Sequence, residues 1–434
     1  MKVGIFYDDV VLENRLKYVL DFIEHHPLNK KVVFTTNQKQ KKNIFYGKPK
    51  EGYDFIIPRQ DKIFKSSEKF DFACNLYKQS NTLIYSVETV VRNDQFFLDD
   101  NAISFDIFET LFFHLSRIEE TKIDPLHLND RGQINESHLL VVKNKIEKIP
   151  HVDNIVKSFI EILSKNDISI PTQIMVTHDI DFIEKYKSLR SFVRFTARAI
   201  FKREPVKAII NQYKKVRQDN SNDPYNTFPE MLLEHTGIEK RIYFLMGGNH
   251  RFDNTFDLDH PSFIEAINLS DKRGYAIGIH PSFNSWTSVE MILKEKARLE
   301  KSINKKVTIS RQHYLHFDIL KTPQVLIDSG IVEDSSLGFT QRIGFRCGTG
   351  FPYNLYDFSK EAKSELKEVP LVYMDSAAIN ESKISSTPLE EMTKAFQLTN
   401  THNTHICYNF HNSRMDTSLA EGRLIKKIYS DLFL

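Results

Sequence analysis

The pattern of hydrophobic and polar positions changes near Pro171 and divides the chain into two parts. Before that point, apolar runs and helical spacings predict a mixture of strands and amphipathic helices. The strands are expected at 2–7, 31–35 and 54–58, and the helices at 13–25, 105–120 and 152–163. After Pro171, short apolar strands repeatedly end in polar residues, with helical segments between them.

The pattern after Pro171 predicts a parallel sheet or barrel, because strand-then-helix units place successive strands side by side in the same direction. Its strands are expected at 173–176, 241–246, 275–279, 307–310, 330–334, 371–374 and 406–410. Functional side chains of such folds gather at the carboxyl ends of the strands. His, Asp and Arg fall repeatedly at those ends here. The first part has no such density of His, Asp or Gly, so we expect it to be a structural or substrate-shaping domain.

Length and composition narrow the classes of protein. At 434 residues the chain exceeds the size of one typical core, about 250–300 residues, so two domains are expected. A net charge of +2 argues against a globally basic nucleic-acid binder, and 33 Phe exclude dominant disorder. Cys74, Cys347 and Cys407 lie far apart and form no disulfide framework. With no long apolar stretch or signal peptide, we expect a cytoplasmic protein.

One segment departs from this neutral average. Residues 185–217 hold eleven Lys and Arg and a single acid, Glu204, with apolar residues between them. A solvated helical excursion packed on the barrel accounts for this pattern. A platform for an anionic glycan or a lipid phosphate, or a helix at the membrane surface, accounts for it as well. Nucleic acid is not expected as a partner, because no nucleic-acid-binding fold accompanies the segment.

Candidate chemistry begins at 177–181, Thr-His-Asp-Ile-Asp. On an extended chain Asp179 and Asp181 point the same way, so one carboxylate can bind a metal while the other takes a proton. Caps of the following helix are an equally good explanation for that stretch alone. His280, Arg311 with His313, and His411 end further strands. Together these strand ends supply the ligands, base and acid that a mononuclear metal hydrolase needs.

In their order, these motifs resemble the polysaccharide deacetylase family (the NodB-homology domain, carbohydrate esterase family 4). The stretch at 177–181 resembles the family's TFDDG motif, 277–280 its second motif, 311–314 its Arg-containing third motif, and 406–411 its last. The subgroup with HDxD, GxHPS and RxHY motifs and an extra N-terminal domain is the most similar. The resemblance implies a distorted (β/α)7 barrel over 165–434, preceded by a smaller α/β accessory domain over 1–150.

The metal site departs from the family pattern. The second metal-binding histidine should stand four residues after His280, where this chain has Asn284. We expect Asp181, His280 and His313 to hold the metal, His313 replacing the missing histidine. Asn284, His178 or water remain as substitutes. The ligand types favour Zn²⁺ as the divalent ion.

The resemblance further implies a hydrolase of carbon–nitrogen, non-peptide bonds that removes N-acetyl or O-acetyl groups from a sugar or polysaccharide precursor. Asp179 is then the base, Arg311 keeps it ionised, and His411 is the acid. Substrate-binding residues are expected at Tyr314 and at Arg346 and Tyr353, which lie in a Gly-rich stretch (334–353) that could wall the cleft. A structural ion pair is an equally good explanation for Arg346. Two alternatives remain open: a catalytically degenerate barrel that binds a glycan or a protein partner, and a hydrolase of another carbon–nitrogen bond.

Overall fold

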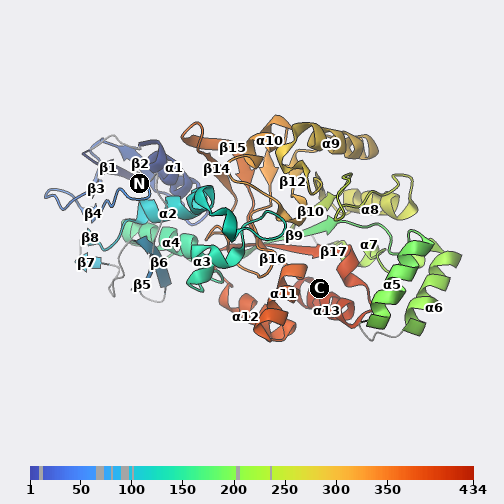
Figure 1. Ribbon diagram of the computed structural model, residues 1–434. Helices are drawn as coiled ribbons and strands as arrows, with labels where there is room; N and C mark the ends of the chain where they lie inside the picture. The colour runs from blue at the N-terminus through green and yellow to red at the C-terminus, as the bar shows by residue number, and fades with distance from the viewer. Residues whose placement is uncertain are drawn as a thin grey trace.

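The computed structural model shows a mixed α/β protein, which confirms the predicted class (Figure 1). It describes residues 1–8, 13–64, 73–79, 82–88, 97–99, 102–201, 206–234 and 237–434. Within them, one six-stranded sheet lies in the N-terminal part and a nine-stranded sheet in the C-terminal part. The expected domain limits, 1–150 and 165–434, stay a prediction.

The N-terminal sheet has the strand order β2-β1-β3-β4-β8-β7. Its strands are β1 (Lys2–Phe6), β2 (Val33–Thr36), β3 (Lys42–Tyr46), β4 (Phe55–Ile57), β7 (Phe97–Asp99) and β8 (Ala102–Ile103), with a separate hairpin of β5 (Ala73–Gln79) and β6 (Thr82–Glu88). The helices are α1 (Glu13–His25), α2 (Ile107–Ser116), α3 (Leu140–Lys143) and α4 (His151–Ser164). The sequence pattern located α1 and α4 well but missed β3 and the hairpin.

Helix α2 is buried along its whole length. It begins at the Asp106 cap, whose side chain accepts a hydrogen bond from the Glu109 amide. It ends at Arg117, which takes the left-handed conformation (φ 55°). The helix is therefore shorter than the predicted 105–120, because the chain turns at Arg117 and continues as a 3₁₀ turn.

The C-terminal sheet has the order β14-β15-β13-β12-β11-β10-β9-β17-β16, and of its neighbouring pairs only β14–β15 is antiparallel. Its strands are β9 (Gln173–Ile180), β10 (Glu239–Phe244), β11 (Ala276–Ile279), β12 (Ile309–Ser310), β13 (Glu333–Asp334), β14 (Tyr353–Asp357), β15 (Ala362–Glu368), β16 (Leu371–Met374) and β17 (His405–His411). The predicted parallel arrangement is thus present. Strand β9 runs four residues beyond its predicted end, through Asp179, and the β14–β15 hairpin was not predicted.

Helices connect these strands. They are α5 (Leu189–Phe201), α6 (Val206–Gln218), α7 (Phe228–Met231), α8 (Pro261–Lys272), α9 (Val289–Ile303), α10 (Thr322–Asp328), α11 (Asp375–Ser385), α12 (Leu389–Thr399) and α13 (Ala420–Phe433). Helices α5 and α6 form a pair at the end of the molecule farthest from the N-terminal sheet (Figure 1). No helix in the described ranges has both the length and the apolar character needed to cross a bilayer.

The nine-stranded sheet is strongly curled. Arg311, directly after β12, reaches the Cys407 Sγ atom of β17 at 3.5 Å. In the strand order β17 lies four places from β12, which is roughly 19 Å in a flat sheet at about 4.8 Å per strand. The sheet must therefore wrap around the Arg311 side chain. Among the described strands no pairing joins β16 to the other end of the order, so closure into a (β/α)7 barrel is not established.

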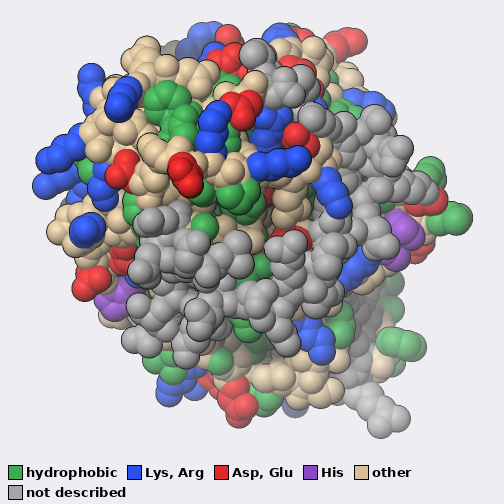
Figure 2. All heavy atoms as spheres, turned by 90° about the vertical axis from the view of Figure 1, so that its left-hand side faces the viewer, with side chains coloured by type: hydrophobic (Ala, Val, Ile, Leu, Met, Phe, Trp, Pro, Cys, Tyr) green, Lys and Arg blue, Asp and Glu red, His purple; other side chains and the backbone are tan. Residues whose placement is uncertain are grey.

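The two parts of the chain share a buried charge network. Glu120 receives hydrogen bonds from Arg117 (2.9 Å) and from Arg346 (3.1 and 2.9 Å), and all three side chains are buried. Burial alone would raise the pKa of Glu120, but Arg346 and then Arg117 lower it to about 2. Figure 2 faces the N-terminal end, where basic and acidic side chains mix over the described surface. The network around Glu120 is, in contrast, buried between the two parts.

We expect Glu120→Ala to lower the free energy of unfolding by about 3–5 kcal/mol, because it leaves the buried Arg346 guanidinium without its carboxylate and leaves Arg117 with Glu119 alone. Chemical denaturation checks this. Asp21→Asn is the matched control: it breaks an exposed ion pair with Lys363 (2.9 Å) across the same boundary and should cost at most ~1 kcal/mol. Equal losses in the two variants would contradict the role given to the network.

Candidate active site

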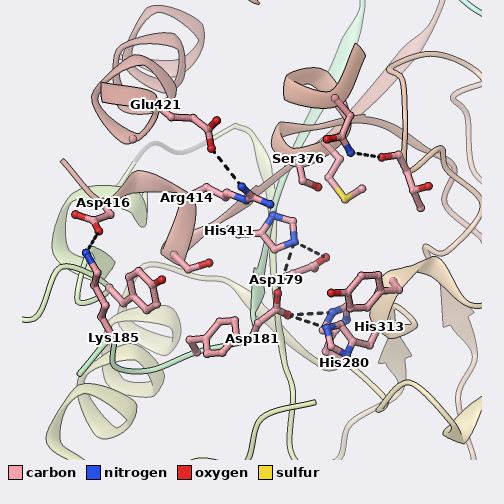
Figure 3. Close-up of a pocket in the computed structure, with 18 of the residues that line it drawn as sticks. Asp179, Asp181, Lys185, His280, His313, Ser376, His411, Arg414, Asp416 and Glu421 are labelled. Atoms are coloured by element: carbon pink, nitrogen blue, oxygen red, sulfur yellow. Dashed lines mark hydrogen bonds and ion pairs between the residues drawn. The ribbon is translucent and has the colours of Figure 1, made fainter. Parts of the chain in front are cut away.

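A cavity of about 640 Å³ lies at the carboxyl ends of β9, β11, β12 and β17 (Figure 3). Six of the side chains that the sequence singled out line it: Asp179, Asp181, His280, His313, Tyr314 and His411. Arg311 lies behind Asp179 and does not line the cavity. Each of these residues follows or ends a parallel strand, which is why residues far apart in sequence meet here. Its volume lies within the range of about 300–1,000 Å³ that is usual for small-molecule sites.

Asp181, His280 and His313 form a cluster suited to a metal ion. Each offers one ligand atom, and these atoms lie within 4.8 Å of one another. Asp181 Oδ1 is 3.4 Å from His280 Nε2 and 3.7 Å from His313 Nε2, and it is buried without a hydrogen bond from any described residue (Figure 3). His280 donates from Nδ1 to the Arg311 carbonyl at 2.5 Å, which turns its Nε2 atom toward Asp181.

The ring of His313 is oriented by Asp253. The two groups meet at 3.0 Å through His313 Nδ1, so the Nε2 lone pair is directed at Asp181. Asp253 is held in turn by the backbone amides of Phe283 (2.9 Å) and His250 (3.1 Å). Gly248 permits this packing: its φ is +100°, and a Cβ there would lie 2.3 Å from Asp253 Oδ2.

The other candidate ligands lie elsewhere. Asn284 is exposed and precedes a 3₁₀ turn, outside both the cluster and the cavity lining. His178 is fully buried, with Nδ1 bonded to the Phe410 carbonyl at 3.1 Å, and burial lowers its pKa to about 4. Of Asn284, His178 and His313, the three side chains considered in place of the second metal-binding histidine, only His313 lies in the cluster.

Asp179 is buried but ionised. Its Oδ1 accepts a hydrogen bond from Arg311 (3.0 Å) and its Oδ2 one from Asn409 (2.8 Å). Burial opposes ionisation, yet Arg311, followed by His280 and His411, holds the pKa of Asp179 below its ordinary value. A carboxylate in this state can accept a proton at neutral pH.

His411 faces the two carboxylates from β17. Its Nε2 is 3.9 Å from Asp179 Oδ2 and 4.0 Å from Asp181 Oδ2. On the other side of the ring, Nδ1 meets Asp375 Oδ1 at 2.6 Å, while the His411 amide donates to Asp375 Oδ2. Burial disfavours the imidazolium, but Asp375 above all, then Asp181 and Asp179, raises the pKa of His411 to about 9. His411 therefore carries a proton that it can donate.

The N-terminal part reaches the rim of the cavity through Arg131. Its guanidinium lies 5.0 Å from the centre of the Tyr314 ring, and both side chains line the cavity. The neighbouring Gln133 donates to the Tyr314 carbonyl at 2.7 Å. Asn129 accepts hydrogen bonds from the amides of Arg131 and Gln133, which fixes the loop. Neither Arg131 nor its loop was singled out by the sequence.

Two of the expected substrate-binding residues do not line this cavity. Arg346 is buried against Glu120, and its third contact is the Gly338 carbonyl. Tyr353 is buried too, and its hydroxyl donates to the Leu115 carbonyl at 3.1 Å. The Gly-rich stretch that suggested a cleft wall thus packs against the N-terminal part, and only Tyr314 of the three expected residues lies at the cavity.

Three supporting residues were not predicted as part of the site: Asp253, Asp375 and Asn409. Asp375 directly follows β16, so its place at a strand end was a usable signal. Asn409 lies two residues before His411 and therefore on the same face of β17. Asp253 lies in an irregular loop after β10, and nothing in the sequence pattern marks it.

Comparisons with known proteins identify little. Residues 5–167 match a family of unknown function (DUF7033). No curated protein matches the chain. Among solved structures, a "putative polysaccharide deacetylase" from Mycobacterium smegmatis matches 60% of this chain and 84% of its own, with 13% identity and a TM-score of 0.35. A likeness of that degree carries neither fold nor activity over to this chain.

Asp253→Asn should weaken zinc binding about 10–100-fold, the usual effect of removing a carboxylate that orients a metal-binding histidine. Chelator competition with Zn²⁺ measures the dissociation constant. Asp257→Asn, in the same connection but exposed, is the control and should bind like the unaltered protein. Unchanged affinity in Asp253→Asn would remove Asp253 from the site.

In metal-free protein His411 should titrate at about 9 by NMR, and Asp375→Asn should lower that pKa because it removes the largest favourable charge. Since the folded pKa lies above the ordinary value of about 6.5, the stabilisation from His411 is complete below pH ~6.5 and disappears as the pH rises through 9. Thermal unfolding between these limits checks the sign. An ordinary His411 pKa would refute the assignment.

Proposed function

We propose that this protein is a divalent-metal-dependent hydrolase that removes an acetyl group from an acetylated saccharide. One observation carries the proposal: the ligand atoms of Asp181, His280 and His313 lie within 4.8 Å of one another, directly beside an ionised Asp179 and a proton-bearing His411. The motif order, which resembles polysaccharide deacetylases, supports the same chemistry and a (β/α)7-type closure of the curled sheet.

The donor set fits a metal ion. One carboxylate and two imidazoles are ligand types that Zn²⁺ accepts, and a hydrolytic site keeps a further position open. The buried Asp181 Oδ1 atom, which accepts no hydrogen bond from the described residues, is the kind of oxygen that a cation satisfies. A cation held there would supply Lewis acidity toward an acyl carbonyl and toward water.

The proton steps fall to two neighbouring residues, Asp179 and His411, beside the proposed metal cluster. Asp179 accepts the proton of the attacking water, and Arg311 keeps it ionised between turnovers. His411 protonates the departing amine, and Asp375 keeps its ring turned so that Nε2 faces the cavity. The base and the acid thus differ in charge state because one is paired with a guanidinium and the other with a carboxylate.

We also propose the substrate class from the cavity lining. Tyr314 and Arg131 form an aromatic and cationic rim, which suits the face and the polar substituents of a sugar ring. Nucleic acid is not proposed as a substrate. The sugar is left to a substrate panel.

The test is acetate release from a panel of acetylated aminosugars by the zinc-loaded protein. Asp179→Asn should keep its metal and lose about 10²–10⁴-fold in kcat/KM, the usual contribution of a positioned base. Asp181→Asn and His280→Ala should instead lose most of the metal, because each removes one of about three ligands. Metal content measured alongside activity separates the two roles.

Asp257→Asn again serves as the carboxylate control and should retain both metal and activity. If Asp179→Asn empties the site while Asp181→Asn keeps its metal, the roles of the carboxylates are exchanged. Release of a product other than acetate would indicate a hydrolase of another carbon–nitrogen bond. A folded protein that binds no divalent metal and releases no product would favour a binding protein and end this proposal.

A further inference from the structure

Helix α5 presents a row of apolar side chains to solvent. Leu189, Val193 and Ile200 are 65%, 57% and 63% exposed, and Phe201 at the end of the helix is 91% exposed. Spacings of four and seven residues place the first three on one face of the helix. Four large apolar residues this exposed on one 13-residue helix are more than the scattered single cases usual on a protein surface.

The row is not needed to hold α5 in place, because the opposite face already packs. Phe192 stacks on Tyr213 of α6, with 4.1 Å between ring centroids, and Phe195 lies edge-on to Tyr186. Ile209 and Val216 of α6 are buried in the same small cluster. The pair of helices therefore has its own core, and the outer apolar row remains uncovered.

Cations border this row. Arg190 and Arg194 each follow one of its members in sequence, both are exposed, and neither has an ion pair with a carboxylate in the described part of the chain. Helix α6 adds four exposed cations, Lys207, Lys214, Lys215 and Arg217. An apolar row with basic residues along its border is typical of a helix that lies in the interface of an anionic membrane.

The basic residues beside this row lie close to the candidate active site. Arg194, Phe195 and Ile209 line the large cavity together with Asp181 and His280. A smaller cavity of about 270 Å³ adjoins it and contains Lys187, Arg190 and Arg194 in its lining. A phosphate bound at these cations would lie next to the mouth of the catalytic cavity.

We infer that α5 and α6 dock this protein on a bilayer that contains anionic phospholipid. The apolar row enters the boundary between head groups and acyl chains, and Arg190 and Arg194 contact lipid phosphates. The catalytic cavity then opens beside the membrane surface. Docking stands independently of the proposed function; only the further step, that the acetylated saccharide is carried at that surface, rests on it.

The experiment is co-sedimentation of the full chain with vesicles, after treatment with a chelator so that metal binding plays no part. Vesicles of phosphatidylcholine alone are compared with vesicles that also contain phosphatidylglycerol. We expect binding to the anionic vesicles that weakens as salt rises. The triple variant Leu189→Ser, Val193→Ser, Ile200→Ser should lose at least about tenfold in partitioning, because its apolar contact area is removed.

The matched control carries three serines at other exposed apolar positions, Leu126→Ser, Ile384→Ser and Leu398→Ser, and should bind like the unaltered chain. Arg190→Gln with Arg194→Gln should remove the preference for anionic lipid. Circular dichroism should show both serine variants folded, since every altered side chain is exposed.

Equal partitioning of the α5 triple variant and the unaltered chain would overturn the inference. So would a chain that ignores both vesicles but forms dimers which the triple variant dissociates, because the row would then be an interface between copies. Asp179→Asn should bind vesicles normally. Vesicle binding without acetate release would thus reject the proposed hydrolase and leave the docking surface standing.

Discussion

The buried pair of Arg311 and Asp179 is the interaction on which the C-terminal part depends. Arg311 is fully buried, and its guanidinium also bonds Thr177 of β9 and Ser335 after β13, and lies 4.6 Å over the Tyr243 ring of β10. A charge in that place is tolerated only with partners on several strands at once. The curl of the sheet supplies those partners, and the same curl brings the strand ends around one cavity.

Two carboxylates orient the imidazole rings of the histidines in this site. Asp253 behind His313 and Asp375 behind His411 use the same contact, a carboxylate on Nδ1, and each turns an Nε2 atom into the cavity. The groups that face each Nε2 atom then distinguish the two histidines. His313 faces a single carboxylate oxygen in a cluster of ligands, whereas His411 faces Asp179 and Asp181 together and holds its proton. Under the proposed function, the same contact on Nδ1 would serve metal ligation at His313 and proton donation at His411.

The sequence pattern grouped the residues that line the cavity, but it did not identify the residues that hold those side chains in place. Parallel strands bring their ends together whatever their exact limits, so Asp179, Asp181, His280, His313 and His411 could be grouped from strand ends alone. Asp253 could not, because it lies in an irregular loop and acts through a residue 60 positions away. Arg346 could not be assigned to either of its two explanations for a similar reason. Its partner Glu120 is 226 positions distant, and a Gly-rich stretch has the same sequence pattern whether it borders a cleft or lies in an interface.

The loop that carries Arg131 connects the N-terminal part of the chain to the cavity of the C-terminal part. It belongs to the N-terminal part, yet it touches Tyr314, the residue next to a proposed metal ligand. Substitutions in that loop can change what the cavity admits while the ligands, the base and the acid stay as they are. In the proposed hydrolase, the N-terminal part would thus help to set which substrates enter, whereas the chemistry would stay with the C-terminal strand ends.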